Sequence, residues 1–187
     1  MLHVDFESYC DINVRDVGAH VYARHRSCEV LMMGWAYDND QPELWVPDGP
    51  WDYDSIPQHI VDHLIDGGLF CAHNAEFEHQ IFQYVLDINI PLKQVRDTAA
   101  LALINGYPKS LAGAGAAIGL PVDKQKDKRG GLLIRKFCTP RKPTKNNPLT
   151  RNYRDDFPEE WLEFCDYCRQ DVVAEQEIWR RLNAADS

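Results

Sequence analysis

The chain has 187 residues, of which 44% are hydrophobic, so a single domain with an apolar core is expected. It contains no run of about 18 apolar residues and does not open with a basic segment followed by an apolar one, so neither a membrane span nor a signal peptide is expected. The formal net charge of −9 argues against a surface that binds nucleic acid throughout.

The six cysteines are scattered along the chain, at Cys10, Cys28, Cys71, Cys138, Cys165 and Cys168. A chain of this length can bury a core without disulfides, so we expect reduced, buried or half-buried thiols in a cytoplasmic protein. Cys165 and Cys168 have the spacing of half a zinc site, but no second pair with this spacing occurs. Packing within a helix is therefore the favoured interpretation of that pair.

The first predicted element is a strand over residues 2–7, in which apolar residues alternate with His3, Asp5 and Glu7. The alternation places both carboxylates on one face, roughly 6–7 Å apart along the strand. Two like charges this close resist joint ionisation unless a cation neutralises them. The pattern therefore indicates a site for a hard metal ion, and the competing interpretation is a solvent-facing edge strand with two unrelated acids.

The next part of the chain predicts an antiparallel unit. Residues 8–28 are mixed and give no clear assignment. The apolar run over 29–37 predicts a central strand, residues 38–40 a turn, and residues 43–46 a returning strand. Residues 1–46 are therefore expected to form a three-stranded antiparallel sheet.

Short strands and helices then alternate. Ser55 is expected to cap a helix that ends near Ile65, before two glycines. The following turn signals and apolar periodicities predict a strand over 69–72, a helix opened by residues 73–75, a strand over 94–97, a helix over 98–104 and a helix over 111–118 capped by Ser110.

The segment 124–154 is strongly basic. It holds eleven of the 20 Lys and Arg residues of the chain and one acid, Asp127. Three prolines and weak periodicity predict a loop over most of it, with room for a short helix over 132–137. The segment fits either a phosphate-contacting surface or a solvated flexible loop.

A long helix is predicted from Pro158 to the C-terminus, because Pro and two acids form a favourable first turn and apolar residues then recur at helical spacing. The order of elements predicts an α/β fold with a mixed sheet. Tyr167 and Asp171 lie four residues apart on one face of this last helix. Glu78 lies in the first turn of the helix that follows Asn74, and Asp97, at a strand end, is a weaker candidate.

Three short acidic patterns occur in order along the chain: Asp5-x-Glu7, Asn74-x-x-Phe77-Glu78 and Tyr167-x-x-x-Asp171. Together they resemble the three exonuclease motifs of the DEDDy 3′–5′ exonucleases. That group has the ribonuclease H-like fold and includes the proofreading domains of family A DNA polymerases and the RNase D enzymes. The resemblance covers essentially the whole chain.

Further stretches make the resemblance more specific: Asp123–Lys128, Arg141–Lys145 and Tyr167–Asp171 are similar to the N-terminal exonuclease part of phage-type family A polymerases. One position departs from the family pattern, which usually has Asp where Glu78 stands. Glu is one methylene longer, and a different rotamer can bring its carboxylate to the same ion.

The resemblance implies a two-metal site for Mg²⁺ or Mn²⁺, with the ions about 3.5–4 Å apart. The ligands would be Asp5, Glu7, Glu78 and Asp171. One ion would lower the pKa of the attacking water and the other would stabilise the leaving 3′ oxygen. Tyr167, with Glu7, would orient the water.

The resemblance also implies contacts with the single-stranded 3′ end of DNA. Asn74 and Phe77 would touch it, and Phe6 and Ser8 are assigned to substrate binding as well. The competing interpretation for Phe77 is a core position beside Ile81. In the basic segment, the residues expected to guide the strand towards the acidic site are Lys124, Lys126, Lys128 and Arg129.

We therefore expect a single ribonuclease H-like domain over residues 1–187, acting as a metal-dependent 3′–5′ exodeoxyribonuclease that proofreads for a DNA polymerase. The polymerase would be either a missing part of the same chain or a separate partner, in a bacterial or phage-infected cytoplasm. One alternative is a stand-alone RNA-trimming exonuclease of RNase D type. Another is a catalytically silent domain that binds nucleic acid for a polymerase.

Overall fold

The computed structural model describes residues 1–121 and 124–183, and for residues 124–126 it describes the backbone only. Its centre is a five-stranded mixed sheet with the strand order β3-β2-β1-β4-β5. The strands are β1 (Leu2–Tyr9), β2 (Glu29–Tyr37), β3 (Glu43–Trp45), β4 (Phe70–Ala72) and β5 (Val95–Asp97). β1, β2 and β3 pair antiparallel, which confirms the unit expected for residues 1–46, and β4 and β5 run parallel to β1.

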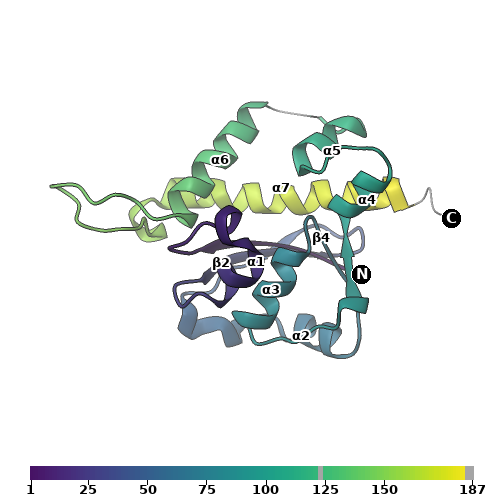
Figure 1. Cartoon of the computed structure of the whole chain (residues 1–187), viewed down its shortest axis with the longest axis horizontal. Coiled ribbons are helices and arrows are strands. Elements are labelled where there is room, and N and C mark those ends of the chain that lie inside the picture. The colour runs from purple at the N-terminus through teal and green to yellow at the C-terminus, as the bar shows by residue number, and fades with distance from the viewer. Residues whose placement is uncertain (122–123, 184–187) are drawn as a thin grey trace.

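Helices cover both faces of the sheet (Figure 1). They are α1 (Val14–Arg24), α2 (Gln58–Ile65), α3 (Glu76–Tyr84), α4 (Thr98–Ile104), α5 (Leu111–Ala117), α6 (Lys124–Cys138) and α7 (Pro158–Asn183), with short 3₁₀ turns at η1 (Pro50–Ser55), η2 (Leu92–Gln94) and η3 (Arg154–Asp156). α1, α2 and α3 lie on one face, α6 and α7 lie on the other, and α4 and α5 pack on the C-terminal half of α7. This is the mixed α/β architecture of the ribonuclease H-like fold, and the long closing helix is confirmed.

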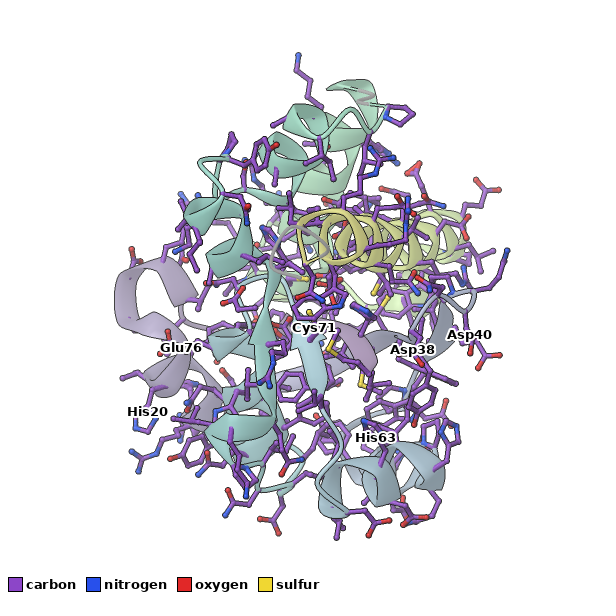
Figure 2. The ribbon with its side chains drawn as sticks, turned by 90° about the vertical axis from the view of Figure 1, so that its right-hand side faces the viewer. His20, Asp38, Asp40, His63, Cys71 and Glu76 are labelled. Atoms are coloured by element: carbon purple, nitrogen blue, oxygen red, sulfur yellow. The ribbon has the colours of Figure 1, made fainter. Side chains whose placement is uncertain are left out.

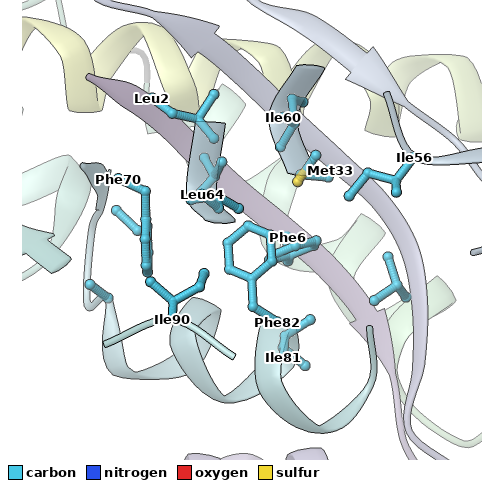
Figure 3. Close-up of a cluster of buried hydrophobic side chains, with 14 of the residues drawn as sticks. Leu2, Phe6, Met33, Ile56, Ile60, Leu64, Phe70, Ile81, Phe82 and Ile90 are labelled. Atoms are coloured by element: carbon cyan, nitrogen blue, oxygen red, sulfur yellow. The ribbon is translucent and has the colours of Figure 1, made fainter. Parts of the chain in front are cut away.

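The alternation of β1 divides the polar site from the main core. Leu2, Val4 and Phe6 are buried under α2 and α3, where Phe6 meets Phe82 edge-on with ring centroids 4.9 Å apart (Figure 3). Burying each large apolar side chain contributes roughly 1.5–3 kcal/mol to folding, so the strand is held firmly in this register. A shift by one residue would turn Asp5 towards the core.

Gly34 allows α7 to approach the sheet closely. It lies on β2 directly opposite Asp5. A Cβ at this position would lie 2.9 Å from Val172 Cγ2 and 3.1 Å from Cys168 Sγ, closer than packed atoms tolerate. The missing side chain therefore lets the motif-bearing turns of α7 pack against the strand that carries Asp5.

The basic segment differs from the expectation. Residues 124–138 form helix α6, which includes the short helix allowed over 132–137 but begins eight residues earlier, where a loop was predicted. The apolar side chains Leu133 and Phe137 are buried against α7, and this packing outweighs the poor helix propensity of Gly130 and Gly131. Residues 139–153 are irregular, as predicted, and extend away from the sheet in Figure 1.

The expected helix cap at Ser55 is also wrong. α2 begins at Gln58 after Pro57, because a residue that precedes proline is driven out of the helical region and Ile56 accordingly has ψ 134°. The Ser55 hydroxyl instead accepts a hydrogen bond from Trp45 Nε1 at 2.9 Å. The unassigned residues 8–28 include α1, whose first turn is capped by the Asn13 side chain.

The remaining expected elements are present within a residue or two, and Ser110 caps α5 as predicted. All six cysteines are free thiols, five of them buried and Cys28 half-buried, as expected. Within residues 1–121 and 124–183, no helix combines the length and the apolar character needed to cross a bilayer.

Candidate metal centre

β1 delivers two carboxyl groups to the α7 side of the sheet. Glu7 is buried, Asp5 is half-buried, and one oxygen of each lies within 4.8 Å of the other and of Cys168 Sγ. The Cys168 thiol donates a hydrogen bond to Asp5 Oδ2 at 3.5 Å, and the Cys138 thiol donates a longer one to Glu7 Oε2 at 3.9 Å. The predicted pairing of these two acids on one face is confirmed.

α3 contributes the third carboxyl group. Glu78 is only 3% exposed, and its Oε1 accepts a weak hydrogen bond from the Phe6 backbone N–H at 3.5 Å. Its Oε2 is buried without any hydrogen-bond partner among the described residues. A buried, unpartnered carboxylate oxygen is costly, so this atom is suited to a ligand that the protein alone does not supply.

The turn before α3 is fixed by Asp97 and His73. Asp97 accepts hydrogen bonds from the backbone N–H groups of Asn74 (2.9 Å) and Ala75 (3.1 Å), and it also caps α4. Asn74 has a positive φ of 69°, which this double contact stabilises. His73 bridges Thr98 Oγ1 and the Lys109 carbonyl, so both Asp97 and His73 have positioning roles.

α7 contributes Asp171 and, one turn earlier, Tyr167. Asp171 is close enough to Asp5 that the two charges raise each other's energy, and burial and that charge raise the pKa of Asp171 well above its usual range. The ring of Tyr167 packs on Gly130 of α6, where an added Cβ would come within 2.1–2.8 Å of three ring atoms. α6 thus forms one wall of the site.

Burial and mutual repulsion oppose charge on the whole cluster. Burial raises the pKa of Asp5 to about 7, although the Cys168 hydrogen bond opposes the shift. Burial, together with the charges of Asp5, Asp171 and Glu78, raises the pKa of Glu7 well above its usual range. Burial and the charge of Asp5 do the same for Glu78.

Among the side chains that the structure describes, no Lys or Arg forms an ion pair with any of these four acids. Oxygen ligands are the ones that Mg²⁺ and Mn²⁺ prefer. The donor set and the unpartnered Glu78 oxygen therefore fit divalent cations.

Three residues near this cluster were not singled out by the sequence. Glu175 follows Asp171 by one helical turn and is fully buried, with a hydrogen bond of 2.9 Å to His3 on β1. Burial raises the pKa of Glu175 and lowers that of His3 to about 4, so both groups favour their neutral forms. Asp127 of α6 lies near enough for its charge to raise the pKa of both Asp171 and Tyr167.

The four-residue spacing from Tyr167 through Asp171 to Glu175 was the available signal for Glu175. Cys71 completes the group with His3 and Glu175 in the interior, and its position under α7 can be followed in Figure 2. Asp127 gave no such signal, because its proximity depends on the packing of α6.

The residues assigned to substrate contacts fall into two groups. Asn74 is exposed, and Phe77 is half-buried with its ring 5.6 Å from that of Tyr22. The Phe6 ring is in the core, and the buried Ser8 hydroxyl is hydrogen-bonded to Tyr22 Oη at 2.7 Å. The side chains of Phe6 and Ser8 are therefore buried, and their assignment to substrate binding stays a prediction.

The four basic residues assigned to the strand belong to α6. The side chains of Lys124 and Lys126 lie outside the described residues, and Lys128 is exposed. Arg129 forms ion pairs with Glu163 and, at 3.5 Å, with Glu160 of α7. Part of its charge is thus used within the protein.

The sequence of this chain is similar to part of a known phage protein. No protein-family model matches the chain. Over 185 residues, 97% of its length, the chain is 32% identical to a DNA polymerase of Bacillus phage SP02. It spans 28% of the length of that polymerase. The similarity relates the whole chain to part of a phage DNA polymerase. This agrees with the resemblance of its motifs to a domain of phage-type polymerases.

Proposed function

We propose that this domain is a metal-dependent 3′–5′ exodeoxyribonuclease. The observation that carries the proposal is the convergence of four carboxyl groups from β1, α3 and α7, with one buried Glu78 oxygen left without a partner. Burial and mutual repulsion raise the pKa of all four carboxyl groups, so at neutral pH this arrangement costs folding free energy when no cation is bound. It is explained if the group serves to bind cations.

Asp5, Glu7, Glu78 and Asp171 would hold the ions. Bound divalent cations would supply a water nucleophile of lowered pKa and stabilise the leaving oxygen of a phosphodiester. The pKa of Tyr167 is raised by burial and by the charges of Asp171 and Glu7, so its phenol stays protonated at neutral pH. Tyr167 would thus orient a water by hydrogen bonding and would not act as a base.

The surroundings of the site give the chain a way to hold a 3′ end. Asn74 is exposed in the turn before α3, the helix that carries Glu78, and Phe77 of that helix is half-buried. A base stacked on an aromatic face gains roughly 1–3 kcal/mol. α6, whose Gly130 lies against the Tyr167 ring, also carries the exposed Lys128, whose positive charge suits a phosphate.

DNA is the proposed substrate because the relative is named a DNA polymerase. We further propose that the domain proofreads for a polymerase, carried either in the same chain or as a partner, in the cytoplasm of a bacterium or a phage-infected host. The alternatives remain an RNA-trimming enzyme of RNase D type and a silent domain that binds nucleic acid.

The test is a degradation ladder on single-stranded DNA and RNA of the same sequence, labelled at either end, with Mg²⁺, Mn²⁺ or EDTA. The proposal predicts stepwise shortening of 5′-labelled DNA, early release of a labelled mononucleotide from 3′-labelled DNA, and no reaction in EDTA. Faster degradation of RNA would favour the RNase D-type reading. Complete inactivity with both metals would favour the silent domain.

A further inference from the structure

A cleft of about 550 Å³ opens beyond the carboxyl end of β1. Its walls come from the end of β1, the connection between α1 and β2, the C-terminal end of α3, η1 and residues 150–151. Tyr9, in its lining, follows Glu7 by two residues, which is roughly 7 Å along a strand. The cleft therefore adjoins the metal centre and shares none of its carboxyl groups.

Positive charge gathers in this cleft from two distant parts of the sequence. Arg24 and Arg26 come from the end of α1 and the connection after it, and Arg151 comes from the basic segment. Arg24 and Arg26 are exposed, and neither forms an ion pair with a carboxylate among the described side chains. Two guanidinium groups without acidic partners suit phosphate oxygens.

The third arginine is held in place. Arg151 forms an ion pair with Glu29 at 2.7 Å, and its guanidinium lies 3.9 Å from the ring centre of Tyr9. Glu29 offsets the charge of Arg151, and Asp11 in the lining accepts a hydrogen bond from Tyr9 Oη. The net positive charge of the cleft therefore depends on Arg24 and Arg26.

Aromatic rings line the cleft as well. Tyr84, at the end of α3, is 41% exposed, and Arg24 lies over its ring at 5.5 Å. His20, at the surface in Figure 2, contacts both Arg24 and the edge of Tyr84. Tyr53 is fixed by a hydrogen bond of 2.9 Å from the Val30 N–H. One exposed tyrosine ring, that of Tyr84, thus lies next to two arginines without acidic partners, and this is a combination that can hold a single strand, with a base on the ring and phosphates on the cations.

We infer that this cleft binds nucleotides of the single strand next to the one being removed, with phosphates on Arg24 and Arg26 and a base against Tyr84. The inference rests on the proposed nuclease function for its choice of ligand. It differs from the guiding role predicted for Lys124, Lys126, Lys128 and Arg129 of α6, because α1, which ends at Arg24, packs on the face of the sheet opposite α6.

The test separates the cleft from the metal centre. The variant is Arg24→Gln with Arg26→Gln, and the matched control is Lys93→Gln with Arg180→Gln, which removes the same charge outside the cleft. One substrate is the p-nitrophenyl ester of thymidine 5′-monophosphate, which fills the cutting site alone, and the other is a DNA single strand of about ten nucleotides. For the long strand we expect KM to rise about tenfold in the cleft variant, with kcat nearly unchanged and the ester cleaved at the wild-type rate.

Binding of the same strand, measured in EDTA, tests the cleft without any chemistry. Loss of two phosphate contacts should reduce the log–log salt slope by about 1.4. Tyr84→Leu should weaken binding at least about fivefold and leave the slope unchanged. A cleft variant that binds with the wild-type slope, or a control variant that loses as much as the cleft variant, would overturn the inference. A wild-type protein that binds the strand but cleaves neither substrate would instead refute the proposed function.

Discussion

Each carboxyl group of the metal centre is harder to ionise in the folded protein than in the unfolded chain. Asp5 has a folded pKa of about 7 against an ordinary value of 3.8. A group with a raised folded pKa keeps a proton that the unfolded chain has released, so its stabilising effect is complete below pH 3.8 and is lost as the pH rises through about 7.

The melting temperature of the metal-free protein is therefore expected to fall between about pH 4 and pH 7.5. Mg²⁺ or Mn²⁺ should restore it, and by more at about pH 8 than at about pH 5, because cations bind the ionised carboxylates. Thermal unfolding in EDTA and in metal at both pH values measures this. Equal stabilisation by metal at the two pH values would argue that the ions bind elsewhere.

Glu78 stands where the family usually has Asp, so its role as a metal ligand needs a direct test. Glu76 provides the control. Both are acids in the first turn of α3, but Glu76 is exposed, as Figure 2 shows, whereas Glu78 is buried. We expect Glu78→Gln to reduce the exonuclease rate by more than about 100-fold, since even loss of a group that merely supports a ligand costs 10–100-fold. Glu76→Gln should leave the rate within about twofold of wild type, and similar losses in both variants would remove Glu78 from the metal site.

Tyr167 is expected to matter less than a metal ligand. Tyr167→Phe removes one hydroxyl and keeps the ring contact with Gly130. The rate at saturating substrate should fall by about 10²-fold, the low end of the range for groups that handle a proton, because the ions still generate the nucleophile. Single-turnover kinetics would measure it, and a loss as complete as that of Glu78→Gln would give Tyr167 a further role.

At the scale of elements, α6 determines the position of Tyr167 through one glycine. Gly130→Ala would place a methyl group within 2.1–2.8 Å of the tyrosine ring, whereas Gly131→Ala meets no atom within 4 Å. Both substitutions raise helix propensity by about 1 kcal/mol, so the pair isolates the contact. We expect Gly130→Ala to lower kcat at least tenfold and Gly131→Ala to preserve it while raising the melting temperature. Equal rates in the two variants would show that the α6 wall is not needed for catalysis.

Local patterns were sufficient to predict which main residues of the candidate site share a face of their strand or helix. Alternation along β1 predicted that Asp5 and Glu7 share a face, and helical spacing predicted the same for Tyr167 and Asp171. The unpartnered oxygen of Glu78 could not be predicted, because it depends on how closely α3 packs on β1. The hydrogen bonds that Asp97 accepts from Asn74 and Ala75 could not be predicted either, because they join residues more than twenty positions apart.

The largest error in the fold shares this cause. Three prolines and weak periodicity over residues 124–154 predicted a loop with at most a short helix over 132–137, but burial of Leu133 and Phe137 against α7 stabilises a helix over the whole of Lys124–Cys138. The early strands were predictable because one face of each is packed on the core. Helix α6 was not predictable in full, since the α7 residues on which it packs lie more than twenty residues further along the chain.

For the molecule as a whole, the sheet order places the candidate metal centre on the central strand β1, flanked by β2 and β4 and covered by α7. The three elements that supply carboxyl groups are separated by roughly 70 to 90 residues of chain, so only the complete fold assembles the site. The chain covers 28% of the length of the related phage DNA polymerase. This coverage fits a domain that lies within, or acts beside, a larger polymerase.

The central claim is that the four carboxyl groups bind divalent cations, and direct titration with Mn²⁺ tests it most simply. Electron paramagnetic resonance of free Mn²⁺ counts bound ions without any substrate or turnover. We expect two Mn²⁺ sites per chain at about pH 8, with at least one lost in Asp5→Asn and both retained in Glu76→Gln. Absence of saturable Mn²⁺ binding, or unchanged binding in Asp5→Asn, would contradict it.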